Sequence, residues 1–139
     1  MRFSRVVFLG FDLVRRLHDR VIVQTGGMPG IRDQGLLESA VARPMQSFGD
    51  ELLFPTLASM AAALTVGIIQ NHPFLDGNKR TGIAAGMAFL RANEYALAEN
   101  QGYWIDVVTD VVCRRRTESE LAEAFAKEMG SDCQVELDE

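Results

Sequence analysis

The chain has 139 residues, of which 47% are hydrophobic and 24% are charged, and its formal net charge is −5. This length allows one domain with a full hydrophobic core and is too short for two ordinary domains. The acidic balance argues against a broad nucleic-acid footprint, which needs a basic surface, so we expect any phosphate binding to be local.

Neither an export signal nor a membrane anchor is expected from the sequence. The apolar runs at residues 6–11 and 57–69 are too short for a membrane span, and the first is also too short for a secretory core. The two cysteines, Cys113 and Cys133, show no metal-ligand spacing, and a disulfide scaffold is unusual at this chain length. We therefore expect a protein of the reducing cytoplasm that binds neither a membrane nor nucleic acid directly.

Helical periodicity dominates the start of the chain. Over about residues 11–24, apolar side chains recur at the i, i+3, i+4 and i+7 positions of one helix face, and the glycine pair at 26–27 is expected to end this helix. Asp33 is a good N-cap for a short helix that stops before Pro44. Residues 43–55 contain glycine, aspartate and proline, and they predict a loop or a small flap.

The two most apolar segments of the chain predict a pair of buried central helices. Residues 56–70 and 83–90 are apolar nearly all round, and a helix without a polar face is normally buried. Alanines and glycines within and beside both segments would let the two helices approach closely.

Two more helices are expected after this central pair. One carries apolar residues at helical spacing over 104–111, and another begins after Thr117, where Thr-Glu-Ser-Glu forms a capping-box pattern. The whole pattern predicts an all-α fold, a compact single domain of about six helices over residues 1–130. Residues 131–139 are expected to form a short acidic tail that frays.

The most polar stretch of the chain, NHPFLDGNKRTG at residues 71–82, lies between the two central helices. Pro73 disfavours helical geometry at His72, so the first of these helices ends there. The second begins near Asn78, and its first backbone N–H groups lack partners within the helix and carry the positive end of its dipole. Gly77 permits close approach of a ligand, so the pattern predicts an anion-binding site.

The side chains of this loop indicate phosphoryl or nucleotidyl transfer. Lys79 and Arg80 lie in a first turn whose helix dipole disfavours cations, which implies a strongly anionic ligand such as a polyphosphate. Asp76 is the only carboxylate of the loop, and Mg²⁺ on nucleotide phosphates takes one or two protein carboxylates. Imidazole is the side chain that titrates nearest to neutral pH, so His72 is the candidate general base.

Each of these residues also has a simpler interpretation. Asp76 is compatible with a plain helix cap, Lys79 and Arg80 with solvated surface charges, and His72 with an ordinary loop histidine. Each simple interpretation is the more common one for a single residue, but their coincidence in one loop favours a functional site. The other histidine, His18, lies on an apolar helix face, and we expect it in the core or at its boundary. The loop matches neither a P-loop nor a zinc-ligand pattern.

Residues 72–80, HPFLDGNKR, resemble the Fic motif H-P-F-x-[D/E]-G-N-[G/K]-R, with every fixed position filled. Three further features resemble the death-on-curing (Doc) branch of the Fic/Doc family. They are Lys79 in place of the usual second glycine, GMPGIRD at residues 27–33, and LLESA at residues 36–40. The similarity runs over most of the chain.

This resemblance implies a compact helical fold with the motif between two central helices, and transfer from a nucleoside triphosphate to a protein hydroxyl. It implies that His72 deprotonates the hydroxyl, that Asp76 holds Mg²⁺, and that Arg80 contacts phosphate. The nucleotide-binding and phosphate-binding set that it implies comprises Gly77, Asn78, Lys79 and Arg80.

The Doc branch further implies the toxin of a toxin–antitoxin pair. Such a toxin uses ATP to phosphorylate elongation factor Tu, and a Phd-type antitoxin blocks it by binding a groove on its helices. Lys79 fills space that glycine leaves open in Fic enzymes that transfer AMP, and we hypothesise that it makes ATP present its γ-phosphate. A protein adenylyltransferase and a non-catalytic binding module of the same fold are the alternatives.

Two expectations concern control and target binding. The self-inhibitory pattern [S/T]-x-x-x-E-[G/N] of Fic enzymes is absent, because Leu52 follows the nearest match at residues 47–51. This fits control by a separate antitoxin. Residues 45–53 are the expected docking segment for the acceptor peptide.

Overall fold

The computed structural model describes residues 2–3, 5–98, 100–135 and 137–138 of the chain. Over these residues the chain forms six α-helices, one 3₁₀ turn and four two-residue strands. The helices are α1 (Phe11–Thr25), α2 (Gln34–Ala42), η1 (Arg43–Met45), α3 (Leu57–Asn71), α4 (Asn78–Ala92), α5 (Gln101–Val112) and α6 (Glu118–Met129). The strands are β1 (Arg2–Phe3), β2 (Ser47–Phe48), β3 (Glu51–Leu52) and β4 (Leu137–Asp138).

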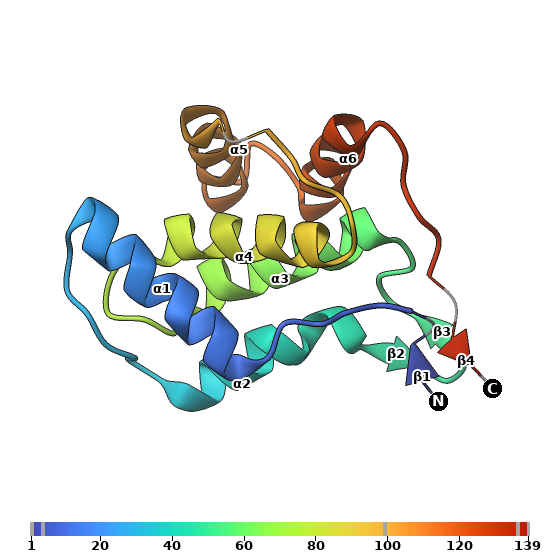
Figure 1. Ribbon diagram of the computed structural model, residues 1–139, viewed down its shortest axis with the longest axis horizontal. Helices are drawn as coiled ribbons and strands as arrows, with labels where there is room; N and C mark the ends of the chain where they lie inside the picture. The colour runs from blue at the N-terminus through green and yellow to red at the C-terminus, as the bar shows by residue number, and fades with distance from the viewer. Residues whose placement is uncertain (1, 4, 99, 136, 139) are drawn as a thin grey trace.

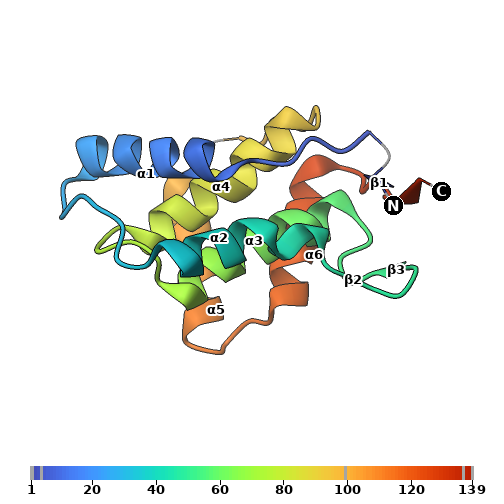
Figure 2. The same cartoon turned by 90° about the horizontal axis from the view of Figure 1, so that it is seen from below.

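Helices α3 and α4 run side by side through the centre of the molecule (Figure 1). Helix α3 packs against α2, α4 and α6, while α4 packs against α1 and α5. Seen from below, α2 lies along α3, and α1 crosses α4 at an angle (Figure 2). The expected helical fold with the polar loop between two central helices is therefore confirmed, with two very small sheets added. Among the described residues, none of the helices combines the length and apolar character that crossing a membrane requires.

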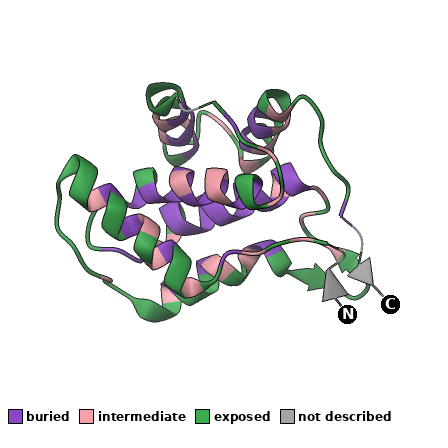
Figure 3. Ribbon diagram, viewed as in Figure 1, coloured by how far each residue is buried: buried purple, intermediate pink, exposed green. Residues whose placement is uncertain are grey.

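Helix α3 is the core element of the fold. Every residue from Leu57 to Ile69 is buried except Ser59, which takes part in the capping box with Thr56 at the start of the helix. Figure 3 shows α3 as an almost continuous buried segment, surrounded by helices that each expose one side. The absence of a polar face in this sequence is explained by this position, because neighbouring helices contact α3 on several sides.

Two glycines let α4 approach α3 closely. A Cβ atom at Gly82 would lie 2.9 Å from the Cγ2 of Ile69, and one at Gly86 would overlap the hydroxyl of Thr65. That hydroxyl donates to the Gly82 carbonyl over 2.8 Å. Small residues at these positions therefore set the distance between the two helices that hold the polar loop.

The helix boundaries follow the capping residues that the sequence contains. The Asp33 carboxylate accepts from the amide of Leu36 at the start of α2, and Thr117 forms a capping box with Glu120 at the start of α6. Helix α1 ends at Gly26, whose φ is 79°, a backbone geometry that glycine adopts without a Cβ penalty. These boundaries confirm the predicted helices to within one or two residues.

The segment at 43–55 is more regular than a loop. Residues 43–45 form the 3₁₀ turn, and β2 then pairs with β3 as an antiparallel hairpin in which Ser47 lies opposite Leu52. The side chain of Phe48 is 84% exposed on this hairpin. The predicted small flap is confirmed as a hairpin.

The expectation that the C-terminal tail frays is wrong for the residues that can be described. Cys133 and Val135 form backbone hydrogen bonds with Leu57 and Pro55, and the side chain of Val135 is buried. Asp132 accepts from the amide of Ala58 over 3.1 Å and so caps the first turn of α3. Strand β4 pairs with β1, which brings the two ends of the chain together (Figure 1). The tail packs because the start of α3 offers unpaired backbone donors.

Candidate active site

The loop at residues 72–77 joins the C-terminal end of α3 to the N-terminal end of α4. It borders an open pocket of about 470 Å³. The residues that line this pocket are Thr25, Gly26, Gly27, His72, Leu75, Asp76, Gly77, Asn78, Lys79 and Arg80. All six site residues predicted from the sequence are thus brought together around one pocket, with the end of α1 on its other side.

His72 is the C-cap of α3 and has left-handed backbone geometry, with φ of 52° and ψ of 51°. As its following proline predicts, it leaves the right-handed helical region. Its side chain is exposed, and its Nδ1 lies 3.2 Å from the side-chain Nδ2 of Asn78. The carbonyl of His72 accepts from the Nε of Arg32 over 2.7 Å. The imidazole is therefore open to a ligand while its backbone is held by another part of the chain.

Asn78 holds the loop closed from inside. It is 5% exposed, its Oδ1 accepts from the amide of Phe74 over 3.1 Å, and its Nδ2 donates to the Phe74 carbonyl over 3.0 Å. Exchanging the two amide atoms would set donor against donor and acceptor against acceptor. The Asn78 side chain is thus engaged within the loop, and its backbone N–H is left as the group for an anion.

Asp76 is the carboxylate of the pocket, and two backbone amides orient it. Its Oδ1 accepts from Gly77 over 2.9 Å, and its Oδ2 accepts from Met28 over 3.3 Å. The chain passes so closely that a Cβ atom at Gly27 would lie 2.7 Å from Oδ2. The φ of 113° favours glycine at this position, and a larger residue there would displace the Asp76 carboxylate.

Asp76 fits a metal site in which a single protein carboxylate binds the ion. Within the part of the chain that the structure describes, no group of three or more histidine, cysteine, aspartate and glutamate side chains could hold a metal ion. A single oriented and exposed carboxylate fits Mg²⁺ that arrives with nucleotide phosphates, since such ions keep several waters.

The buried side of the loop is formed by His18 and Phe74. Their rings are parallel, with centroids 3.8 Å apart and an interplanar angle of 4°. His18 is 1% exposed, and its Nε2 lies 2.8 Å from the carbonyl oxygen of Asp76. The prediction that His18 belongs to the core is confirmed, but its contact with the loop has no local signal in the sequence.

The first turn of α4 presents the features expected of an anion site. Gly77 is the N-cap with φ of 76°, no side chain caps the helix, and the turn contains no acidic residue. Thr81 is the first residue whose amide donates back to Gly77, which leaves the earlier amides free of helix partners. Lys79 and Arg80 are exposed in this turn. The positive end of the helix dipole and two cations therefore face the same solvent region.

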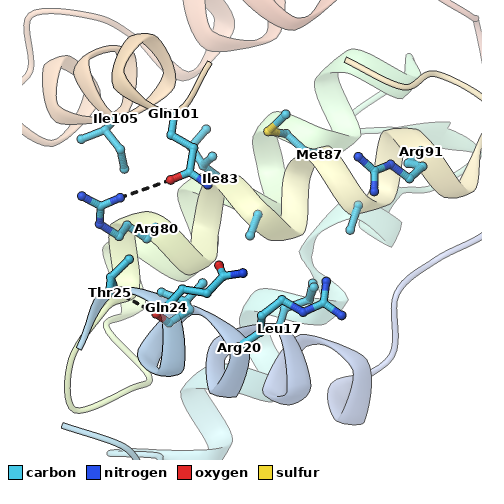
Figure 4. A pocket seen from close by; sticks show the side chains of 13 residues that line it. Leu17, Arg20, Gln24, Thr25, Arg80, Ile83, Met87, Arg91, Gln101 and Ile105 are labelled. Carbon is cyan, nitrogen blue, oxygen red and sulfur yellow. Dashed lines mark hydrogen bonds between the residues drawn. The ribbon is translucent and has the colours of Figure 1, made fainter. Parts of the chain in front are cut away.

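A second cavity, of about 200 Å³, adjoins the first between α1, α4 and α5. Arg80 and Thr25 line both cavities. Figure 4 shows the guanidinium of Arg80 directed toward Gln101, whose Oε1 lies 3.5 Å from its Nη1. Apolar side chains such as Ile83 and Met87 also line this cavity. Apart from Arg80, the residues that form this cavity were not among the predicted site residues.

The sequence profile of the Fic/DOC family matches residues 8–90. The chain is 45% identical over 73 residues to a protein of Mycolicibacterium smegmatis named "Toxin Doc", covering 52% of this chain and 56% of the relative. It is 35% identical over 77 residues to "Protein kinase doc" of Escherichia phage P1, covering 55% and 60%. The chain thus spans little more than half the length of these curated relatives.

Proposed function

The chain belongs to the Fic/DOC family, and on this premise we propose that it is a Doc-like toxin. The proposed reaction transfers the γ-phosphate of ATP to a hydroxyl group of elongation factor Tu and so blocks translation in the cytoplasm. A relative named as a protein kinase supports the type of transfer. The target and a Phd-type antitoxin are proposed from the resemblance of the motif.

The observation that carries this proposal is the shared pocket of His72, Asp76 and the first turn of α4. The amides of this turn, with Lys79 and Arg80, would bind the phosphates of ATP. Asp76 would hold Mg²⁺, which would neutralise charge on the phosphates. Phosphoryl transfer depends mainly on positioning and electrostatic stabilisation, which these groups would supply.

The proposed step begins at the exposed imidazole of His72. An unprotonated ring nitrogen takes the proton of the acceptor hydroxyl, whose oxygen then forms a bond with the γ-phosphorus. The bond between this phosphorus and the oxygen bridging to the β-phosphate breaks, and ADP leaves with that electron pair. Arg80 and the helix amides stabilise the charge on the transferred group. The β2–β3 hairpin, with Phe48 exposed, is the proposed docking element for the acceptor.

The test is transfer of a radiolabel from ATP to purified elongation factor Tu. We expect label from the γ position and none from the α position, and we expect His72→Ala to abolish transfer. Arg16→Gln is the matched surface control, because Arg16 is exposed on α1 and lines neither cavity. Label from the α position would instead establish an adenylyltransferase, and no label from either position would count against a kinase that acts on elongation factor Tu.

A second test addresses toxicity. Induced expression in a bacterial host should arrest growth, and His72→Ala should relieve the arrest if catalysis causes it. Arrest that persists in this variant at the same protein level would favour a non-catalytic binding module.

A further inference from the structure

Arg32 connects the segment before α2 to the end of α3. Its Nε donates to the carbonyl of His72 over 2.7 Å, and its Nη2 donates to the carbonyl of Asn71 over 2.9 Å. Its own backbone amide donates to the carbonyl of Pro73 over 2.7 Å. Three consecutive carbonyls at the end of the helix are thus held by one residue.

These contacts address a specific problem of the backbone. His72 has a φ of 52°, and a residue with a Cβ atom keeps this geometry only where its surroundings enforce it. The last carbonyls of a helix also lack partners within the helix and carry the negative end of its dipole. A guanidinium satisfies both needs, since its rigid fork provides two donors and a positive charge.

We infer that Arg32 is a positioning residue for His72. By holding the carbonyls on both sides of the turn, it keeps His72 in the left-handed conformation from which the imidazole faces the pocket. This inference rests on the proposed role of His72 as the general base. Arg32 does not line the pocket itself, and none of the ion pairs among the described residues involves it.

The phosphate-binding side of the site is held by other contacts. Asp76 is oriented by Gly77 and Met28, and the loop is closed by the hydrogen bonds between Asn78 and Phe74. Loss of the Arg32 guanidinium should therefore disturb the imidazole and leave the ATP site in place. A defect in catalysis with intact ATP binding would therefore distinguish positioning of His72 from general support of the fold by Arg32.

The test compares Arg32→Gln and Arg32→Lys with Arg16→Gln, which makes the same chemical change at an exposed position of α1. We expect kcat to fall roughly ten- to a hundredfold in Arg32→Gln, because small displacements of a catalytic group cost this much. The KM for ATP should stay within about twofold. Arg32→Lys should be intermediate, since an ammonium group cannot reproduce the fork, and the control should match the parent protein.

A second measurement does not require activity. The coupling between the amide and Hα protons of His72 reports its φ angle in the protein without nucleotide. It should change in Arg32→Gln and stay at the parent value in Arg16→Gln. If the parent protein transfers no phosphate, the proposed function fails, and this coupling alone decides the role of Arg32. An unchanged coupling, or a lower melting temperature with unchanged kcat, would overturn the inference.

Discussion

The Nε2 atom of His18 lies 2.8 Å from the backbone carbonyl oxygen of Asp76, although the two residues are 58 positions apart in the chain. The His18 ring also stacks on the ring of Phe74. One buried side chain of α1 therefore contacts two residues of the polar loop, Phe74 and Asp76. Helix α1 is therefore part of the structure that shapes the pocket, even though His18 does not line it.

His18→Leu should destabilise the protein by about 2–4 kcal/mol, because it removes a buried hydrogen bond and a closely stacked ring. His18→Gln should be less harmful, since its amide can still donate toward Asp76. Denaturant unfolding monitored by circular dichroism measures both effects. Val23→Ala is the control on the same helix, because Val23 is 85% exposed, and we expect a change within about 0.5 kcal/mol. A similarly small effect of His18→Leu would contradict this assignment.

Asn78→Ala should cost about 2–4 kcal/mol of unfolding free energy, because the buried amide and carbonyl of Phe74 both lose their partner. The matched control is Asn100→Ala. Asn100 is exposed, and its side-chain Oδ1 accepts from the amide of Tyr103 at the start of α5, so loss of this cap should cost about 1 kcal/mol. The two free energies are obtained from the same unfolding experiment. Equal losses in the two variants would show that the loop does not depend on Asn78.

Gly27→Ala should weaken the binding of Mg²⁺ by Asp76. A Cβ atom there would lie 2.7 Å from Oδ2, and the carboxylate would have to move. We expect the Mg²⁺ concentration that gives half-maximal ATP binding to rise about tenfold, as for other changes beside a metal ligand. Calorimetric titration with ATP at several Mg²⁺ concentrations measures it.

The control for this variant is Gly26→Ala. Gly26 also has positive φ, but a Cβ atom there would meet nothing within 4 Å. Both variants therefore carry backbone strain, and only one touches Asp76. The same Mg²⁺ requirement in both would refute a role for the Gly27 contact.

Gly82→Ala should lower the unfolding free energy by about 1–3 kcal/mol, because the added methyl group overpacks the contact between α3 and α4. Gly102→Ala should be neutral or stabilising by about 0.5–1 kcal/mol, since alanine is the better helix former. At that position in α5 the nearest atom to a Cβ would be 3.8 Å away. Thermal and denaturant unfolding compare the two changes. Stabilisation by both changes would mean that helix propensity, and not packing, governs Gly82.

Features that depend on neighbours in the sequence were predicted well. Asp33 and Thr117 each cap the helix that follows them, and the apolar segment at 56–70 corresponds to the buried helix α3. Pro73 and Gly77 marked the two ends of the polar loop for the same reason. Caps, prolines and glycines act within one turn of the backbone, so their effects can be derived from a short window.

Contacts between distant segments were missed. The docking of residues 132–135 on the start of α3, and the contacts of His18 and Arg32 with the loop, join parts of the chain that only packing brings together. The sequence alone thus determined the helices, their order and a polar loop at the start of α4, because these depend on local propensity and periodicity. Only the tertiary structure decided which side chains hold that loop, because this depends on which helix faces pack against one another.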